Sequence, residues 1–575
     1  MGEIMGNFIK TQNSFADGEV APEFYARDNI NGLSRLENMD VLAGGGLKRR
    51  AGLEHVAGLN SYARLIPFSV GEDDDYLLAL TGGHILVFHD GVQIQDILCV
   101  WPAAALDNLQ YAQRFGTMIF VHPDYQPYVL KKTGSQFTIS KFNFAINEND
   151  MSVNIPFIRF DDASGINITI SSNSLGGNYA TFTTNKDFWT SDNVGTRLLL
   201  LNKQWRIVQY VSPTVVYVYC NGQFTIPSAA VSDWSESAFS ERRGWPCSIT
   251  FHQDRLVFGG SRSYPSGVWL SQVGRHDNFS VGTGLDDEAI FITLLSQQRQ
   301  QICTVVSSDN LQILTSVGEW AISSKPLTPS MVDIKQHTAV GSVASRYLPP
   351  QKIEGATVFI SGSKKDIREL SLDELGENYN ASDLCSFAKH LMQNPIDIAY
   401  NQQRRQLFVV MASGDMAVLN QNSSLGISAW GSYKTQGNFK SVAVIAGETF
   451  VVVERGGEFA LEKFSDSALT DSGNRGFSFA ASALPLRGSG HNASLMRIRK
   501  ITARVINTKT LFINEMRASL PNEIYTPDLP GFSGDAGINL LGCQRNCIQS
   551  PWTIQSSEPL PATVLSITVY GYYMV

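Results

Sequence analysis

The sequence has few charged residues, no long apolar run and little helical periodicity. Charged side chains make up 17% of its 575 residues, whereas 43% are hydrophobic. This balance predicts a folded chain, because disordered chains combine low hydrophobicity with high net charge. No run of about 18 apolar residues occurs, so no membrane span is expected. The first residues lack a basic stretch followed by an apolar core, so no secretory signal peptide is expected either.

Cysteine is also scarce. Seven cysteines are scattered along the chain, and this odd number predicts reduced thiols in a protein made in the cytoplasm rather than a disulfide framework. Cys543 and Cys547 are the one close pair. A loop disulfide or half of a metal site stays open for them, although no second Cys/His pair lies nearby in the sequence.

The usual sequence motifs of catalysis are missing. The chain has no Gly-x-Ser-x-Gly elbow and no His-Glu-x-x-His. Glu319 and Glu369 are the candidates for a general acid/base pair, but a glutamate in a hairpin is more often exposed or ion-paired. We therefore expect no enzyme activity, no cofactor and no metal.

The net charge of −8 is mild for this length. Dedicated nucleic-acid binders are usually basic, so the charge argues against that class. It does not exclude a surface past which DNA slides.

One unit recurs along the chain: an apolar strand, a tight turn rich in Gly and Asp, and a second apolar strand. The clearest copy has Gly456-Gly457 as its turn, between the β-branched run at Phe450–Val453 and the alternating return strand. Seven such hairpins are expected, at Leu77–Phe88, Met118–Lys131, Arg255–Leu270, Leu311–Ile322, Thr357–Leu370, Leu407–Leu419 and Phe450–Phe464.

The spacing of these hairpins predicts the architecture. Most turns follow one another at about 42 to 57 residues, close to the length of a four-stranded propeller blade. One interval of about 137 residues has room for a blade plus an insertion. A hairpin cannot bury both of its faces alone, so neighbours must stack. We therefore expect an all-β fold, a β-propeller of about seven blades; a row of separate sandwiches is the second alternative.

The same pattern predicts five segments. Residues 1–60 are expected to form an extended arm that meets a neighbour, and residues 61–149 the first blades. Residues 150–243 are expected to form an inserted β-barrel or sandwich, residues 244–470 the remaining blades, and residues 471–575 a separate C-terminal β domain.

Arg27 and two basic stretches are candidate interfaces. Gly44–Gly46 precedes Lys48, Arg49 and Arg50; this could be a phosphate cradle, but the Walker spacing is absent and a basic surface facing a neighbour is favoured. Ser494–Val505 is the most basic stretch and contains Arg497, Arg499 and Lys500. DNA contact is one interpretation of it, and a solvated face or contact with an acidic neighbouring subunit is favoured.

Several short motifs together resemble a known family. They include Gly18-Glu19-x-x-Pro22, Arg27-Asp28, Asn38, Gly45-Gly46, Arg49-Arg50 and Gly52 near the start, Gly244-Trp245-Pro246 with Arg255–Gly260 further on, and Glu319-Trp320, Asp383-Leu384, His390-Leu391 and Trp430 later. This order is similar to the tail nozzle proteins of short-tailed bacteriophages, also called tail tubular protein B or hub proteins. The family often has Ser at Ala21 and Pro at Ala51.

The resemblance implies a structural virion protein of the phage tail, assembled in the bacterial cytoplasm. It implies a homo-oligomeric ring, typically a hexamer, that contacts the tail adaptor and portal, holds tail fibres or spikes, and lets double-stranded DNA pass. It also gives Pro22, Gly46, Gly52, Gly244, Trp245, Pro246, Glu319 and Trp320 structural roles. A glycan-binding or glycan-cleaving propeller and a cellular propeller scaffold remain as alternatives.

Overall fold

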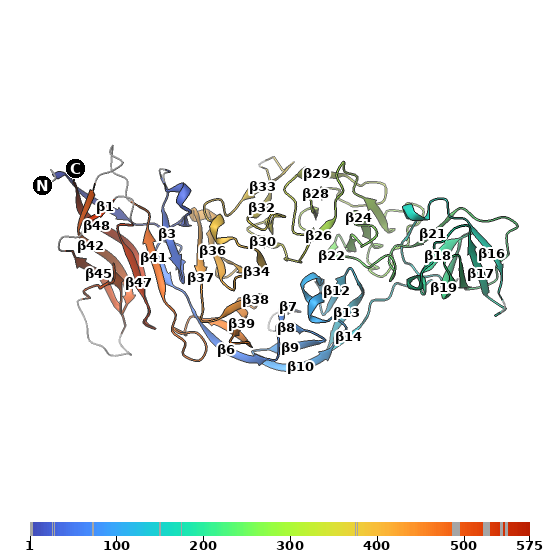
Figure 1. The fold of residues 1–575 in the computed structure, drawn as a ribbon, viewed down its shortest axis with the longest axis horizontal. Coiled ribbons are helices and arrows are strands. Elements are labelled where there is room, and N and C mark those ends of the chain that lie inside the picture. The colour runs from blue at the N-terminus through green and yellow to red at the C-terminus, as the bar shows by residue number, and fades with distance from the viewer. Residues whose placement is uncertain are drawn as a thin grey trace. The chain divides into compact units, whose positions relative to one another are not determined.

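The computed structural model describes residues 4–25, 27, 29–71, 74–148, 151–173, 175–373, 375–376, 378–485, 495–520, 530–540, 544–546 and 550–574. Nearly all regular elements in these ranges are β-strands, joined by a few short 3-10 turns (Figure 1). The predicted all-β class is confirmed. None of the helices in these ranges has the length and hydrophobicity needed to cross a membrane.

The chain divides into two compact units. The first comprises residues 1–103, 348–374 and 380–575, and the second comprises residues 104–347 and 375–379. Each unit is described by itself below.

The fold is a β-propeller with two further β domains, and its described residues contain seven groups of four antiparallel strands. Four groups belong mainly to the first unit: β30 (Gln351–Ile353), β31 (Ala356–Ile360), β32 (Ile367–Leu372) and β33 (Tyr379–Asp383); β34 (Pro395–Asn401), β35 (Gln406–Met411), β36 (Met416–Asn422) and β37 (Ile427–Tyr433); β38 (Asn438–Ile445), β39 (Glu448–Arg455), β40 (Glu458–Ser465) and β6 (Gly52–Leu59); and β7 (Arg64–Ser69), β8 (Asp75–Thr81), β9 (His84–His89) and β10 (Val92–Leu98).

Three groups belong to the second unit: β11 (Gln110–Arg114), β12 (Thr117–His122), β13 (Tyr125–Thr133) and β14 (Gln136–Lys141); β22 (Ser248–His252), β23 (Arg255–Gly259), β24 (Gly267–Leu270) and β25 (Ile290–Thr293); and β26 (Ile302–Ser307), β27 (Leu311–Thr315), β28 (Glu319–Ile322) and β29 (Ile334–Thr338).

All seven predicted hairpins are confirmed, and each is the middle pair of strands in its blade. Middle strands are apolar because neighbouring blades cover both of their faces; Val451, Val452 and Val453 of β39 are all fully buried. At the turn from β39 to β40, Gly456 and Gly457 have φ values of 61° and 89°. Positive φ at both positions is the type I′ geometry that two-residue hairpins need.

Successive blades are joined by a repeated hydrogen bond between their first strands. In the first unit, the Leu65 N–H of β7 donates to Ser441 Oγ of β38 at 3.0 Å, and the Val442 N–H donates to Asp397 Oδ2 of β34 at 3.0 Å. In the second unit, the Val305 N–H of β26 donates to Ser248 Oγ of β22 at 2.7 Å. A buried side-chain acceptor thus satisfies a backbone donor that no strand partner reaches.

Residues 1–60 are not an extended arm, and that prediction is wrong. Strand β6 is the fourth strand of the blade β38–β40, and Phe459 pairs with Leu59 while Ser465 pairs with Gly52. The blade is therefore completed by a strand from the opposite end of the chain. This closure joins the ends of the sequence by main-chain hydrogen bonds along a whole strand.

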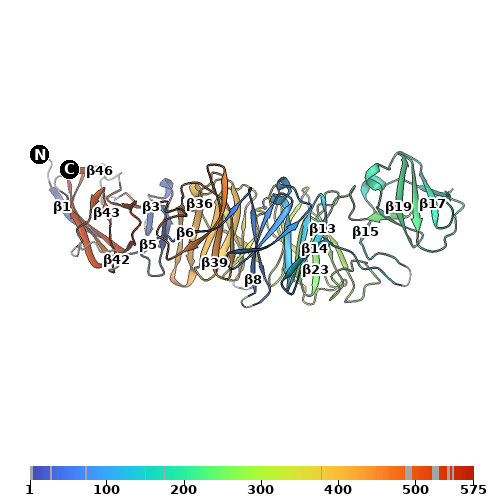
Figure 2. The same cartoon turned by 90° about the horizontal axis from the view of Figure 1, so that it is seen from below.

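The C-terminal domain is likewise built from both ends of the chain, so a boundary at residue 471 does not describe it. One sheet combines β1 (Ile4–Gln12), β4 (Met39–Val41), β5 (Leu47–Arg49), β42 (Leu495–Thr508), β45 (Phe532–Asn539), β46 (Gln544–Asn546) and β48 (Thr563–Met574) (Figures 1 and 2). The facing strands are β3 (Gly32–Glu37), β41 (Phe479–Ala483), β43 (Phe512–Ile513), β44 (Met516–Arg517) and β47 (Thr553–Ser556). One apolar core that includes Phe15 and Trp552 lies in this terminal domain.

The terminal domain is continuous with one blade. Strand β2 (Gly18–Glu19) pairs in parallel with both β3 and β37, so a single ten-stranded sheet runs from β34 to β44. A shared sheet fixes the blade and the domain to each other by backbone bonds rather than by a flexible linker.

The inserted β domain is confirmed in the second unit. Its seven-stranded sheet is formed by β15 (Phe157–Ile158), β16 (Ile168–Ser172), β17 (Tyr179–Thr184), β18 (Arg197–Leu200), β19 (Lys203–Ser212), β20 (Val215–Cys220) and β21 (Trp234–Ser237). Its own core contains Phe182, Trp189, Trp205 and Trp234. It therefore has the buried apolar interior that an independent domain needs.

The hydrogen bond between β38 and β7 yields a first prediction. Replacing Ser441, which is fully buried, by Ala should lower the free energy of unfolding by about 1–3 kcal/mol, because the Leu65 N–H then has no acceptor. The measurement is urea-induced unfolding of the full chain. Ser428→Ala, at an exposed serine of β37, is the matched control and should change stability by less than about 0.5 kcal/mol. Equal effects of the two substitutions would contradict the assigned role.

Candidate interaction site

The basic residues predicted to form an interface divide into two classes in the structure. Arg49 and Arg50 are buried, with 3% and 1% of their surface exposed. The prediction that they meet a neighbour is wrong, because a side chain enclosed by its own subunit offers nothing to a partner. Exposure, which the sequence pattern does not report, separates these two arginines from the others.

Arg50 uses all of its donor directions inside the first unit. It forms a bidentate ion pair with Asp471, at 3.0 and 2.9 Å, and its Nε donates to Asn38 Oδ1 at 2.8 Å. It also donates to the carbonyls of Ala51 and Lys434, and its guanidinium lies 3.6 Å from the centre of the Phe477 ring. Arg50 thus connects the N-terminal segment, the end of β37 and the chain after the last blade.

Arg49 binds main-chain carbonyls. It donates to the carbonyls of Leu560 at 3.0 Å, Leu469 at 2.9 Å and Phe477 at 3.2 Å. Burial and the charge of Arg50 lower the pKa of Arg49 to about 10. Even so, this guanidinium is protonated at neutral pH and acts as a clamp on three separate loops.

The N-terminal motif that contains Gly18 and Glu19 lies against the blade β34–β37. Gly18 forms a parallel β-bridge with Trp430 of β37. Its φ is 61°, and a Cβ at this position would lie 2.5 Å from the Trp430 backbone nitrogen, so only glycine fits. The Glu19 carboxylate accepts the Leu36 N–H at 2.7 Å and lies 2.8 Å from Nε2 of His390. Two motifs far apart in the sequence therefore meet here.

A cavity of about 410 Å³ opens beside Glu19 and His390. Its charged lining is largely paired internally, since Glu37 lies 2.9 Å from Arg35 and 3.1 Å from Lys434. A cavity whose charges already neutralise one another suits a structural joint better than a site that attracts a charged ligand.

The other N-terminal motif residues occupy close contacts. Pro22 opens the short turn Pro22–Phe24, and the Ala21 N–H donates to the Phe387 carbonyl at 2.7 Å. A Cβ on Gly46 would lie 3.0 Å from the Val564 oxygen, and one on Gly52 would lie 2.3 Å from the Thr470 oxygen. Both glycines therefore allow a close approach between chain segments.

Glu319 braces a turn and has little access to any substrate. It is 1% exposed, and its carboxylate accepts the Gly341 N–H at 2.9 Å, the Val340 N–H at 3.3 Å and the Thr338 hydroxyl. The indole of the adjacent Trp320 donates to Gln300 Oε1 at 3.2 Å. Glu369 is half-buried, and burial together with the charge of Glu354 raises its pKa.

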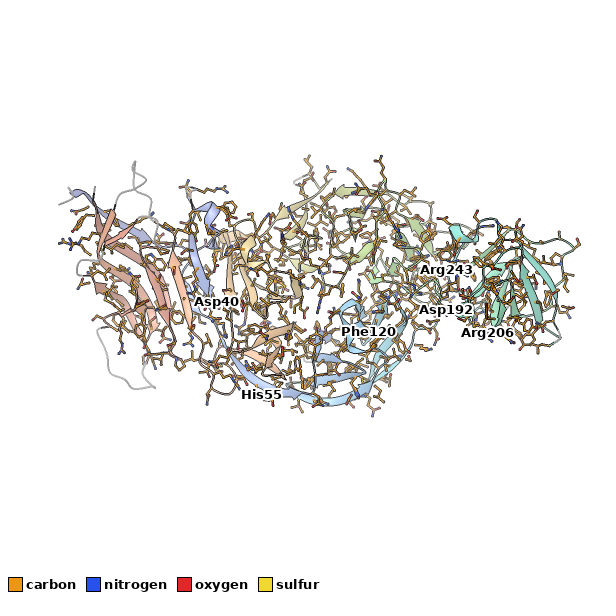
Figure 3. All side chains as sticks on the ribbon, viewed as in Figure 1. Asp40, His55, Phe120, Asp192, Arg206 and Arg243 are labelled. Carbon is orange, nitrogen blue, oxygen red and sulfur yellow. The ribbon has the colours of Figure 1, made fainter. Side chains whose placement is uncertain are left out.

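The inserted domain is anchored by two arginines that the sequence motifs did not single out. Arg243, labelled in Figure 3 where the inserted domain joins the blades, donates to both carboxylate oxygens of Asp162 at 2.9 and 2.8 Å and also pairs with the buried Glu236. Arg242 binds Asp162 at 3.1 Å and lies over the Phe188 ring. The only sign of this anchor in the sequence is that two adjacent arginines directly precede Gly244.

The Gly244-Trp245-Pro246 motif fixes the return of the chain into the blades. Gly244 has a φ of 81°, and a Cβ there would lie 2.6 Å from the Cβ of Arg262. The Trp245 N–H donates to the Pro123 carbonyl at 2.9 Å, and Pro246 is buried. The motif thus holds the crossing between the inserted domain and the blade β11–β14.

The remaining interface candidates are at the surface. Arg27 is exposed and lies 5.3 Å from the Phe387 ring centre, and Lys48 lies 3.6 Å from Asp466. Arg499 and Lys500 are exposed on β42, and Arg497 is half-buried beside them. Asp28, Cys543 and Cys547 lie outside the described residues, and Cys99, Cys220, Cys247, Cys303 and Cys385 are free thiols.

The Arg50–Asp471 ion pair predicts that two acids close together in the sequence contribute very differently to the free energy of unfolding. Asp471→Ala should lower the free energy of unfolding by about 3–5 kcal/mol, because it leaves a buried guanidinium without its counter-charge. Asp466→Ala is the matched control, since Asp466 is 60% exposed and pairs with Lys48 and Arg404 at the surface; it should cost at most about 1 kcal/mol. Denaturant unfolding compares them, and similar losses would contradict the assignment.

Asp162 predicts a pH dependence. Burial alone would raise the pKa of Asp162, but hydrogen bonds and charges from Arg243 and Arg242 outweigh it and hold the pKa below its ordinary value. The stability from this carboxylate is therefore present above the unfolded pKa of about 4 and is lost as the pH falls through the folded value.

In an unfolding experiment followed by tryptophan fluorescence, Asp162→Asn should be less stable than the wild type at pH 7, and the difference should shrink below about pH 4. Asp161→Asn, at an adjacent exposed carboxylate, is the control and should show no such convergence. A difference that stayed constant with pH would argue against the ion pair as its source.

No protein-family model matches the chain, and no curated protein matches it. Among solved structures, the chain is similar to BamB from Moraxella catarrhalis, with 10% identity and a TM-score of 0.32 over 72% of this chain and 100% of that one. It is also similar to YCF48 bound to D1 peptide, with 11% identity and a TM-score of 0.32 over 72% of this chain and 96% of that one. A third similar structure is the β-propeller domain of Cps50 (Swd1) from Myceliophteria thermophila, with 6% identity and a TM-score of 0.31 over 72% of this chain and 100% of that one. Similarity at this level carries no inference about what this chain does.

Proposed function

We propose that the chain is a structural protein of a short-tailed phage tail. In this role it forms an oligomeric nozzle or hub ring that extends the portal and adaptor channel, retains and then conducts DNA, and anchors tail fibres or spikes. The basis is the resemblance described above together with the positions of the residues that carry it.

One observation supports the proposal most. The motif residues come from distant parts of the chain, yet many of them meet in joints: Gly18 with Trp430, Glu19 with His390, and Arg50 with Asn38. These contacts position domains, and the charged groups that line the cavity beside Glu19 are largely paired with one another. Proteins that assemble into a ring are expected to share such buried contacts between chain segments, because each subunit must keep its shape when it binds the next.

The connectivity fits the same role. Strand β48 pairs with β1 on one side and with β42 on the other, each over most of its length. Backbone hydrogen bonds on both sides hold β48 over most of its length, so the strand resists being pulled out of the sheet. A conduit for DNA under pressure needs this kind of resistance.

The proposal is tested by electron microscopy and native mass measurement of the purified chain, alone and with the adaptor and portal proteins of a short-tailed phage. A discrete ring, six copies by the resemblance, is the expected result. The ring should leave DNA migration unchanged at physiological salt, because a channel that neutralised phosphates would hold its cargo.

A chain that stays monomeric in every mixture would overturn the proposal. So would cleavage of a host polysaccharide that Glu319→Gln abolishes, since that result would favour a glycan-cleaving propeller.

A further inference from the structure

The outer face of the terminal-domain sheet carries a compact group of cations and aromatic rings. The group, called the basic face below, consists of Ile9 on β1, Arg497, Arg499 and Lys500 on β42, and Tyr570 and Tyr572 on β48. Strand β48 lies between the other two (Figure 1). Ile9 is opposite Tyr570 on one side, and Lys500 is opposite Tyr570 on the other.

A β-bulge in β42 assembles this face. The pairing with β48 shifts between Ile498 and Lys500, so Arg499 is the extra residue. Ile498 and Ile501 are both fully buried, while Arg499 and Lys500 are both exposed. Strict alternation would have sent Arg499 and Lys500 to opposite faces. The bulge therefore places three cations on one side of the sheet and keeps both isoleucines in the core.

The cations lie over the rings, and Asp535 is near enough for its pKa to be lowered by Arg504 and, less strongly, by the charge of Lys500. Arg497 and Arg499 lie 5.9 and 5.6 Å from the centre of the Tyr572 ring, and Lys500 lies 5.7 Å from that of Tyr570. None of the three forms an ion pair within the ranges that the structure describes, whereas Arg504 on the same strand pairs with Asp535 at 2.9 Å. Ring contact restrains the guanidinium groups, so they lose less freedom on meeting a carboxylate.

The rest of the chain has the opposite charge. Residues 1–50 and 471–575 together contain slightly more Lys and Arg than Asp and Glu, so the whole net charge of −8 comes from residues 51–470. That segment forms the blades and the inserted domain. One copy of the chain therefore carries both a basic face and a long segment of net negative charge.

We propose that the basic face docks on the net-acidic segment, residues 51–470, of a second copy. The contact joins two different surfaces, so a pair of copies keeps one free basic face and one free acidic segment for further neighbours, as ring formation requires. The inference deepens the proposed function by naming the subunit contact, and it rests on that function only for the closure of the ring.

Two features favour a protein over nucleic acid as the occupant. Ile9 is 70% exposed on the same face, and an apolar contact of this kind suits a protein interface better than a phosphate backbone. Tyr572 is 8% exposed and covered by arginines, so no base can stack on it.

The test is sedimentation velocity of the full chain at about 50 and about 500 mM NaCl, chosen because salt screens charge contacts. The wild type should self-associate, and less at high salt. The variant Arg497→Glu/Arg499→Glu/Lys500→Glu should weaken association about tenfold or more. Ile9→Ser should weaken self-association about 3-fold, because one exposed apolar contact is lost.

The matched control is Lys352→Glu/Lys364→Glu/Lys365→Glu, which makes the same charge change within the acidic segment; it should leave association unchanged or stronger. If the reversed variant fails to fold by circular dichroism, Arg497→Gln/Arg499→Gln/Lys500→Gln replaces it, with a smaller expected loss.

A wild type that stays monomeric at both salt concentrations overturns the inference, as does association that survives the triple reversal. Retardation of a 20-base-pair DNA duplex that the reversal abolishes, without self-association, overturns it in favour of nucleic acid. A ring that persists in the reversed variant refutes this contact and leaves the proposed function standing. A salt-sensitive dimer that never closes supports the contact and refutes the ring.

Discussion

The first unit depends on one buried cation and its counter-charge. Arg50 has no exposed side-chain surface, and its partner Asp471 has 1% exposed. An isolated guanidinium would be very costly at this depth, so the two segments that carry the pair must stay together. Those segments are the start of β6 and the chain that leaves the last blade. The ion pair thus enforces the same closure that the pairing of β6 with β40 makes through the backbone.

Each of the two appended domains is held by contacts of its own. The terminal domain shares a ten-stranded sheet with one blade, and the inserted domain is clamped by Arg243 on Asp162 and Glu236. Between the blades, side-chain acceptors such as Ser441 and Ser248 satisfy backbone donors of the next first strand. Buried polar groups do the joining, and surface cations such as Arg499 remain for contacts with other molecules. The proposed role as a subunit of a conduit requires both classes.

The sequence predicted the parts of the fold that are local. Each of the seven hairpins was visible because its two strands are apolar and joined by a short turn. Fourth strands such as β10 and β29 were missed because exposed residues interrupt their apolar pattern. The place of β6 was missed for another reason: its partner β40 lies about four hundred residues away, and no local pattern records such pairing. The terminal domain mixes both chain ends for the same reason.

The candidate site was predicted only in part, because residue type does not reveal burial. Arg50 follows Arg49 and Arg499 precedes Lys500, so each has a basic neighbour, yet one is enclosed by Asp471 and Phe477 and the other faces solvent. The bulge that turns Arg499 and Lys500 to one face is likewise invisible in the sequence, since it depends on the register with β48. The resemblance located many of the joint residues, although their contacts appeared only in three dimensions.

The closure of the chain can be measured directly by hydrogen exchange of the native protein. The peptide that covers Gly52–Leu59 should exchange as slowly as those from β39 and β40, because its amides belong to the same sheet. Fast exchange of this peptide, with β39 and β40 still protected, would show that the segment is a free arm and would contradict the account.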